Sequence, residues 1–300
     1  MKLTKPLILL ILIAVIISSL NSCAKKSSDC GCKKVMSETE LKEMETKWQE
    51  INANVFLLYN QQKIKDAIKL AKESLKFAQK TFGDESLKAA VSYNNIGELF
   101  RLDKKYGDAE KNYKKSLAIR EKLLGKEHPD VALTLNNLAS LYFIENRYDL
   151  AEKNFEEAIR IISKNPSKDN KDNRNLIALL GNLGELYKNT QKYSKAEPIY
   201  KQLLIEREKA EGKTGFNYAK NLNDLGAIYF LEGKYAEAGP IFIQTLNILE
   251  GNLGKNHPGT LTVLENLAEL YKKTGNEQQV RVFQDRIKII QNIGKSTPTS

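Results

Sequence analysis

Residues 124–142 read LGKEHPDVALTLNNLASLY, and residues 253–271 read LGKNHPGTLTVLENLAELY. The chain's two histidines, His128 and His257, lie 129 residues apart and occupy the same position of these two stretches. Catalytic groups gather at one site, whereas a residue that belongs to a repeat recurs along the chain. We therefore interpret His-Pro as the start of a helix, where the missing N–H of proline would have no partner anyway. A proton-transfer role for His128 would need a second group that converges on it, and the sequence gives no reason to expect one.

The quoted stretches belong to a pattern that recurs from about residue 45. A helix with the pattern Asn-Asn-Leu-[Ala/Gly]-x-Leu-[Tyr/Phe] is followed by a short break and a second amphipathic helix. Apolar residues three and four positions apart, such as Leu138, Leu141 and Tyr142, indicate helices and not strands. Alanines mark the register of the second helices at spacings of 42, 42, 45 and 42 residues: Ala67, Ala109, Ala151, Ala196 and Ala238.

Two other residue types keep the same register. Tyrosines recur at Tyr106, Tyr148, Tyr193 and Tyr235, and small residues recur at Gly97, Ala139, Gly184, Gly226 and Ala268. We expect the small residues where the two helices of a hairpin cross closely. One hairpin cannot bury its apolar face alone, so neighbouring hairpins must stack. The sequence therefore predicts an all-α fold, an α-α superhelix (solenoid) of about six helical hairpins over residues 37–293.

These motifs resemble the tetratricopeptide repeat. The 42-residue spacing and the Gly-Lys-x-His-Pro linker resemble the long variant of kinesin light chains and many bacterial proteins, over about residues 45–290. The terminal repeats depart from the pattern, with Ile64, Glu277 and Val280 at register positions, as expected where one face meets water. The three-residue insertion in 165–175 predicts an exposed loop, and residues 294–300 a disordered tail. The resemblance implies binding of peptides or partner proteins.

The resemblance also implies that the first helix of each hairpin lines a concave surface. One column there is Asn52, Asn94, Asn136, Gly181, Asn223 and Glu265, and the next is Ala53, Asn95, Asn137, Asn182, Asp224 and Asn266. Asparagine offers donors and an acceptor, so it can bond an extended peptide backbone whatever its sequence. The same side chains could instead bond neighbouring helices and hold the superhelix together. For the second column both interpretations remain open.

Further along the first helices, aromatic residues alternate with ion pairs. The aromatic positions are Tyr59, Phe143 and Phe230, and the pairs at i,i+3 are Glu98–Arg101, Glu185–Lys188 and Glu269–Lys272. The aromatics are candidate peptide contacts, whereas the pairs could simply stabilise their helices by about 0.2–0.5 kcal/mol each. The surface shows no uncompensated basic stripe, which argues against a nucleic-acid partner.

The N-terminus predicts export and lipidation. The apolar run Leu7–Ile17 is too short to span a hydrocarbon core of roughly 30 Å and is typical of a secretory signal. Leu20-Asn21-Ser22-Cys23 resembles the lipobox of bacterial lipoproteins. The resemblance implies that residues 1–22 are a signal peptide removed before Cys23, which then carries the lipid. Ala24 in place of an aspartate favours the outer membrane of the cell envelope.

Residues 23–36 predict a flexible, lipidated tether, because they are polar and lack periodicity. Cys30 and Cys32 flank a glycine in this segment. In an oxidising compartment they could form a disulfide, bind a soft metal or cross-link chains. Their role stays open.

Nothing in the sequence predicts an enzyme. It holds no phosphate-binding glycine loop, metal-ligand cluster or recognisable nucleophile motif, so we expect no cofactor and no metal. The leading hypothesis is a membrane-anchored scaffold for a protein or peptide partner in the envelope. Because the net charge is +10, a second hypothesis is an anionic envelope polymer bound by lysines such as Lys104, Lys105, Lys114 and Lys115. A third is a regulatory subunit of an envelope enzyme. Partner, pathway, orientation and oligomeric state stay open.

Overall fold

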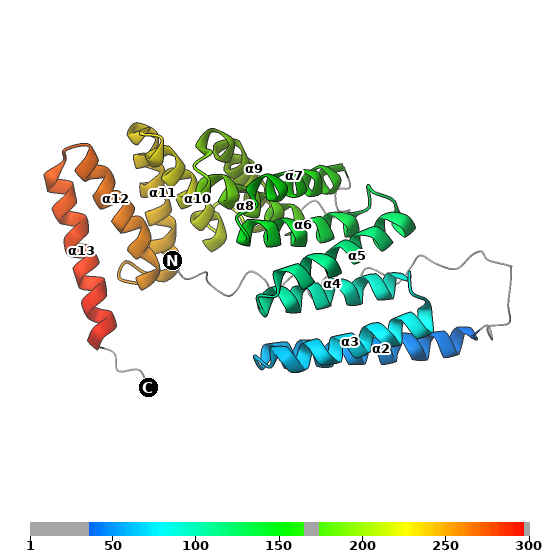
Figure 1. Cartoon of the computed structure of the whole chain (residues 1–300). Coiled ribbons are helices and arrows are strands. Elements are labelled where there is room, and N and C mark those ends of the chain that lie inside the picture. Colours follow the sequence, from blue (N-terminus) through cyan, green and yellow to red (C-terminus); the bar gives the residue numbers. More distant parts are fainter. Residues whose placement is uncertain (1–35, 165–173, 297–300) are drawn as a thin grey trace. The chain divides into compact units, whose positions relative to one another are not determined.

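The computed structural model describes residues 36–164 and 174–296. The expected signal peptide, with Cys23, and nearly all of the expected tether, with Cys30 and Cys32, lie outside these residues. The chain divides into two compact units, Met1–Lys126 and Glu127–Ser300, and each is described by itself. The described residues of both units form helices that pair into hairpins (Figure 1).

The described residues of the first unit form two hairpins. Its helices are α2 (Glu38–Asn60), α3 (Ile64–Phe82), α4 (Leu87–Leu102) and α5 (Tyr106–Leu124). Ser37 begins α2 with a capping box, in which its hydroxyl accepts from the backbone N–H of Glu40 and the Glu40 carboxylate accepts from the Ser37 N–H. This reciprocal pair satisfies two N–H groups that have no partner within the helix.

In the second unit, residues 127–164 and 174–296 form four hairpins. Its helices are α6 (Pro129–Ile144), α7 (Tyr148–Lys164), α8 (Arg174–Asn189), α9 (Tyr193–Glu211), α10 (Phe216–Leu231), α11 (Tyr235–Leu253), α12 (Leu261–Lys273) and α13 (Glu277–Ser296), with the 3-10 turn η1 (Pro258–Thr260) before α12. We call α2, α4, α6, α8, α10 and α12 the first helices and their hairpin partners the second helices. The predicted all-α array of about six hairpins is confirmed.

The residues that mark the repeat have fixed places in each hairpin. Tyr106, Tyr148, Tyr193 and Tyr235 each begin a second helix, as Ile64 and Glu277 do in the terminal hairpins. The register alanines are fully buried, and Val280 takes their place in α13. A side chain three residues into each second helix is therefore enclosed by its first helix, which explains why only a small residue recurs there.

Glycines of the first helices allow close crossing within a hairpin. A Cβ atom at Gly97 would lie 2.7 Å from the ring of Tyr113, and one at Gly226 would lie 2.7 Å from the ring of Phe242. Both aromatic rings are fully buried, so they could not move away from an added methyl group without disturbing the core. The sequence prediction that small residues mark close helix crossings is confirmed.

Two boundaries differ from the sequence expectation. Arg174 and Asn175 begin α8, although the predicted loop extended to residue 175. α13 extends to Ser296, three residues into the segment expected as a tail. Among the helices described here, none is long and apolar enough to cross a membrane.

Candidate functional site

The two histidines cap helices. His128 Nδ1 accepts from the backbone N–H of Asp130 at 3.1 Å, and His257 Nδ1 accepts from that of Gly259 at 3.0 Å. Each is followed by proline at the first helical position. The interpretation of His-Pro as a helix start is therefore confirmed, and the cap explains why an imidazole with a free ring nitrogen recurs at this position.

Replacing both histidines with asparagine is expected to leave partner binding unchanged. Asparagine also caps helices well, so the free energy of unfolding should change little. Titration of the variant with a partner, beside urea denaturation, checks this. A large loss of binding with stability preserved would mean that the imidazoles contact the partner.

The asparagines of neighbouring first helices form a ladder. Asn182 of α8 donates to Asn136 of α6 at 2.9 Å, and Asn266 of α12 donates to Asn223 of α10 at 3.0 Å. In the first unit the Asn95 amide lies 3.5 Å from Asn52 Oδ1. At these positions, an amide of the second column therefore bonds the preceding first helix. The sequence had left open whether these amides bond neighbouring helices or a peptide, and the structure shows that they bond neighbouring helices. Each such bond uses one of the two N–H groups of the amide.

Burial varies along the first column. Asn94 and Asn136 are buried, with 8% and 5% of their surface exposed, whereas Asn52 and Asn223 are half-buried and Glu265 is exposed. The second column is half-buried at Asn95, Asn137, Asn182, Asp224 and Asn266. It therefore keeps part of each polar side chain at the surface. We call the four of these residues that lie in the second unit, Asn137, Asn182, Asp224 and Asn266, the asparagine row.

Asp224 interrupts the ladder for a reason visible in the sequence. Its register partner in α8 is Gly181, which has no side chain to bond. Lys188 of α8 donates to Asp224 at 3.0 Å instead, and it also pairs with Glu185 at 2.6 Å. Burial raises the pKa of Asp224, although Lys188 opposes the shift. An ion pair thus replaces the amide bond between α8 and α10.

The predicted i,i+3 pairs all form, but they differ in their surroundings. Arg101 and Glu98 are joined by two hydrogen bonds, and their side chains are only 14% and 13% exposed. Tyr113 donates to Glu98 at 2.7 Å. Burial opposes ionisation of Glu98, but Arg101 and Tyr113 outweigh it and hold the pKa of Glu98 below its ordinary value. The pair therefore joins α4 to α5, whereas Glu269 and Lys272 lie 3.7 Å apart and largely exposed.

The three predicted aromatic contacts are half-buried at the ends of first helices. Phe143 packs beside Tyr148 with ring centroids 6.0 Å apart, and Phe230 beside Tyr235 at 5.3 Å. Tyr59 packs beside Phe56 at 6.1 Å. In the first unit a depression of about 30 Å³, room for about one water molecule, is lined by residues that include Asn52, Phe56, Tyr59 and Asn95. This surface therefore offers shallow contact and not a closed pocket.

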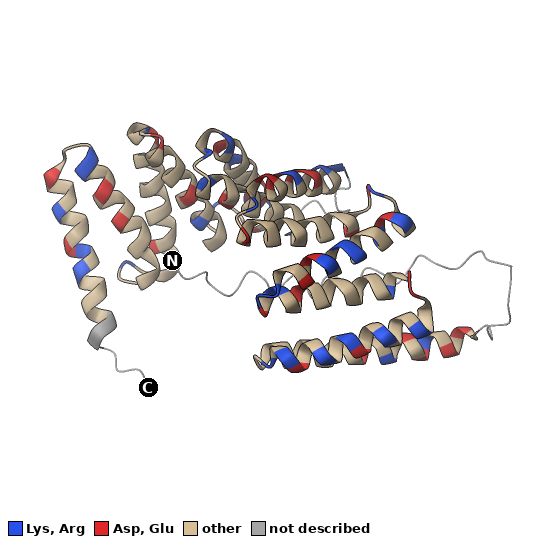
Figure 2. Ribbon diagram, viewed as in Figure 1, with Lys and Arg blue, Asp and Glu red and all other residues tan. Residues whose placement is uncertain are grey.

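The lysines proposed for polymer binding are largely engaged within the chain. Lys105 pairs with Asp103 at 2.6 Å, and Lys114 pairs with Glu110 at 2.7 Å. Lys115 lies over the ring of Tyr93, 5.0 Å from its centroid. Figure 2 shows basic and acidic residues mixed along second helices such as α5 and α7. This mixture weakens the hypothesis of an anionic polymer as partner, because such binding needs cations along a path.

Sequence reasoning missed a second set of contacts between hairpins. Tyr229 of α10 donates to Glu197 of α9 at 3.1 Å, and Lys201 and Lys234 bond the same carboxylate at 2.7 and 3.3 Å. At the preceding junction, Glu152 of α7 accepts from Tyr187, Lys192 and Lys195. We call each such group of glutamate, tyrosine and lysines a clasp. The signal in the sequence is a glutamate directly after the register alanine, at positions 152 and 197.

The described residues contain no group of three or more His, Cys, Asp and Glu side chains that could hold a metal ion. The polar groups described at the first helices are amides, each bonded in part to a neighbouring helix, and ion pairs. Such a surface can bind by hydrogen bonds and apolar contact.

Family models for the tetratricopeptide repeat match most of the described residues. One model matches residues 51–122, 90–164 and 217–284, and a second matches 179–214. The comparison with curated proteins finds no match.

Solved structures share the fold at low sequence identity. BtubC (BKLC) from P. vanneervenii is 22% identical, with a TM-score of 0.65 over 79% of this chain and 94% of that one. A putative kinesin light chain with nearly identical repeats from P. anserina is 16% identical, with a TM-score of 0.60 over 69% and 96%. YrrB, described as a tetratricopeptide protein with an unusual peptide-binding site, is 18% identical, with a TM-score of 0.51 over 73% and 92%.

Proposed function

Because the chain belongs to the tetratricopeptide repeat family, we propose that it binds an extended segment of a partner protein through the asparagine row of its first helices. This fold is typical of protein–protein interaction scaffolds. The peptide-binding site named for YrrB supports the same kind of ligand for this chain.

The observation that carries the proposal is the fixed orientation of the asparagine row. The bonds of Asn182 to Asn136 and of Asn266 to Asn223 hold the amide groups in place before a partner arrives. Side chains that are already ordered lose less conformational entropy on binding. The amides of Asn182 and Asn266 each keep a second N–H group and a carbonyl oxygen, which match the acceptors and donors of a peptide backbone.

Apolar contacts would come from the ends of the same helices. Phe143 and Phe230 lie six residues beyond the asparagine row in α6 and α10, and each is half-buried against a tyrosine. Such rings are ordered and still expose apolar surface, which suits them to contact a partner side chain. The partner would therefore be an extended segment with apolar side chains beside an accessible backbone.

Cross-linking in native membranes, followed by identification of the attached molecule, tests this function. We expect a protein whose binding to the purified chain changes little between low and high salt. Binding to an anionic polymer would instead weaken steeply with salt, because screening reduces the attraction between exposed charges. Recovery of such a polymer as the main adduct would contradict the proposed function.

We also propose that the scaffold is a lipoprotein of the cell envelope, with the outer membrane favoured. The support is the apolar run Leu7–Ile17, followed by Leu20-Asn21-Ser22-Cys23 and then Ala24. Two or more acyl chains on Cys23 would anchor the chain stably, whereas one alone is marginal. Residues 23–36 would then connect the lipid to the first helix.

Replacing Cys23 with alanine is expected to abolish lipidation. Cells grown with a labelled fatty acid should incorporate label into the wild-type chain and not into the variant, which should also leave the membrane fraction. The matched control is Cys30→Ala, which should keep both the label and the membrane association. Equal label in Cys23→Ala and wild type would refute the assignment of Cys23.

A further inference from the structure

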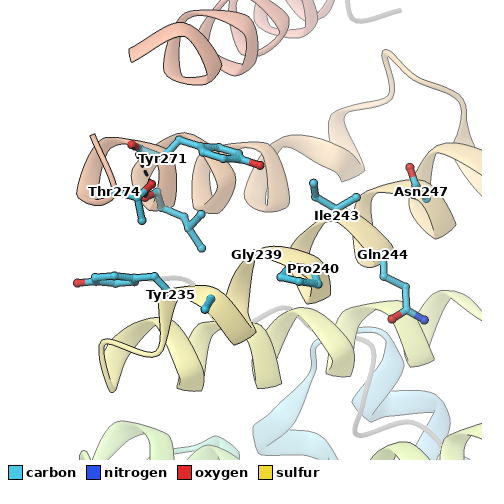
Figure 3. A pocket seen from close by; sticks show the side chains of 10 residues that line it. Tyr235, Gly239, Pro240, Ile243, Gln244, Asn247, Tyr271 and Thr274 are labelled. Atoms are coloured by element: carbon cyan, nitrogen blue, oxygen red, sulfur yellow. Dashed lines mark hydrogen bonds between the residues drawn. The ribbon is translucent and has the colours of Figure 1, made fainter. Parts of the chain in front are cut away.

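An open cleft of about 670 Å³ lies between α11 and α12 of the second unit (Figure 3). Its walls are formed mainly by Tyr235, Gly239, Pro240 and Ile243 of α11 and by Leu270 and Tyr271 of α12. None of these residues belongs to the asparagine row. The volume is within the range of roughly 300–1,000 Å³ that is common for ligand sites.

The preceding hairpin junction has a clasp at the equivalent place. In α9 the clasp uses Glu197 and Lys201. The residues 42 positions later in α11 are Gly239 and Ile243. Lys234, which completes the clasp, is likewise replaced by Asn276. Three charged side chains are therefore lost at this one junction, and the cleft lies where they would be.

Packing does not require the glycine at position 239. A Cβ atom there would meet Leu270 Cδ2 at 3.8 Å, an ordinary contact, whereas one at Gly226 would lie 2.7 Å from the ring of Phe242. Glycine weakens a helix interior relative to alanine. Gly239 therefore weakens α11 relative to alanine, although an alanine would cause no clash there. Because glycine has no side chain, it leaves the cleft open.

The aromatic wall of the cleft differs from a clasp as well. Tyr229 donates its hydroxyl to Glu197, whereas the ring of its counterpart Tyr271 stacks on Phe283 of α13, with centroids 5.7 Å apart and planes at 8°. Ile243 is 39% exposed. The cleft thus presents apolar and aromatic surface to solvent where the clasps present charge.

We propose that this cleft binds an uncharged segment of a partner polypeptide through one bulky aromatic side chain. The lining contains no Asp, Glu, Lys, Arg or His, so a charged group entering it would lose water without gaining an opposite charge. An aromatic side chain would instead bury a large apolar area against Tyr235, Pro240 and Tyr271.

Polar groups at the cleft favour a polypeptide over a small apolar molecule. Gln244, Asn247 and Thr274 line it, and their side chains can bond the backbone on either side of the aromatic residue.

The test fills the cleft with the charged side chains that form the clasp at the preceding junction. In the variant Gly239→Glu with Ile243→Lys, the new carboxylate can pair with the new ammonium and with Tyr271, as Glu197 does with Lys201 and Tyr229. The matched control, Gly251→Glu with Ile205→Lys, makes the same two changes at exposed positions. Circular dichroism and thermal unfolding should show both variants folded. Ile243→Ser, at an exposed site, is a second variant that removes wall contact.

The probe is a phage-displayed library of random 12-residue peptides, selected on the full chain in phosphatidylcholine nanodiscs. We expect the recovered peptides to share a tryptophan, tyrosine or phenylalanine. A synthetic peptide should bind at least tenfold more weakly to the clasp variant and to Ile243→Ser, and equally to the control. Replacing its aromatic residue with alanine should have the same effect.

Three results would overturn the proposal. They are no recovered peptides, equal binding to wild type and to the clasp variant, and binding of N-acetyl-tryptophan amide as tight as that of the peptide. The last would identify a site for small molecules. Because the substituted residues lie outside the asparagine row, these results are independent of the proposed function.

Discussion

Replacing Glu98 with alanine is expected to lower the free energy of unfolding by about 3 kcal/mol or more. The change leaves the Arg101 guanidinium, only 14% exposed, without its carboxylate, and it removes the acceptor of the buried Tyr113 hydroxyl. Removing one partner of a buried ion pair destabilises the fold by this much because the remaining charge stays buried without its counter-charge. Urea denaturation followed by circular dichroism measures the loss.

The matched control is Glu85→Ala. Glu85 also pairs with a cation, Lys122, but the two side chains are 62% and 63% exposed. Exposed pairs contribute little because water solvates both charges. Equal losses in the two variants would show that the surroundings of Glu98 do not strengthen its pair.

The Glu98 pair also makes stability depend on pH. Its pKa in the folded chain is lowered from the ordinary 4.5, so the contribution is fully present above about pH 4.5 and is lost as the pH falls through the lower folded pKa. The stability difference between wild type and Glu98→Gln should therefore shrink as the pH falls below 4.5. A constant difference down to pH 2 would contradict the lowered pKa.

Replacing Phe143 and Asn137 together with alanine is expected to cost about 2 kcal/mol or more of partner affinity. Phe143 would supply an aromatic anchor, and such anchors near the centre of a contact dominate binding. Asn137 lies six residues before it on the same helix, in the asparagine row. Titration of the variant with the partner recovered by cross-linking measures the loss. Because Phe143 also packs beside Tyr148, circular dichroism must first show that the helices persist.

The control is Lys114→Ala with Lys115→Ala on α5, a second helix. These lysines are engaged with Glu110 and with the ring of Tyr93, so the change should leave affinity nearly unaltered. The opposite outcome, with the lysine variant deficient and the Phe143 variant normal, would favour the polymer hypothesis.

The repeat register was predictable because the same residue types recur at fixed spacing in the sequence. The second helices α3, α5, α7, α9 and α11 each have a buried alanine three residues from their start, and Gly97 lies opposite the ring of Tyr113 where two helices cross closely. These steric demands repeat every 42 residues in most of the chain, so a pattern of single residues fixes the hairpins. The same logic identified His128 and His257 as caps.

The finer contacts were less predictable, because they depend on residues that are neighbours only after hairpins stack. The sequence placed Asn182 in a column, but whether it would bond a ligand or Asn136 depended on the spacing of α6 and α8. The cleft followed from Gly239 and Ile243 together, and either substitution alone looks ordinary in a helix. Contacts between hairpins thus need the packed structure, whereas contacts within a hairpin follow from spacing.

Site-specific photo-cross-linking tests the claim that first helices contact the partner. Ser140 lies on α6 between Asn137 and Phe143 and is half-buried, whereas Ser194 lies exposed on the second helix α9. A photoreactive amino acid would replace each serine in turn in cells that express the full chain. We expect a discrete protein adduct from position 140 and none from position 194. An adduct from position 194 alone would place the partner on the second helices and contradict the account.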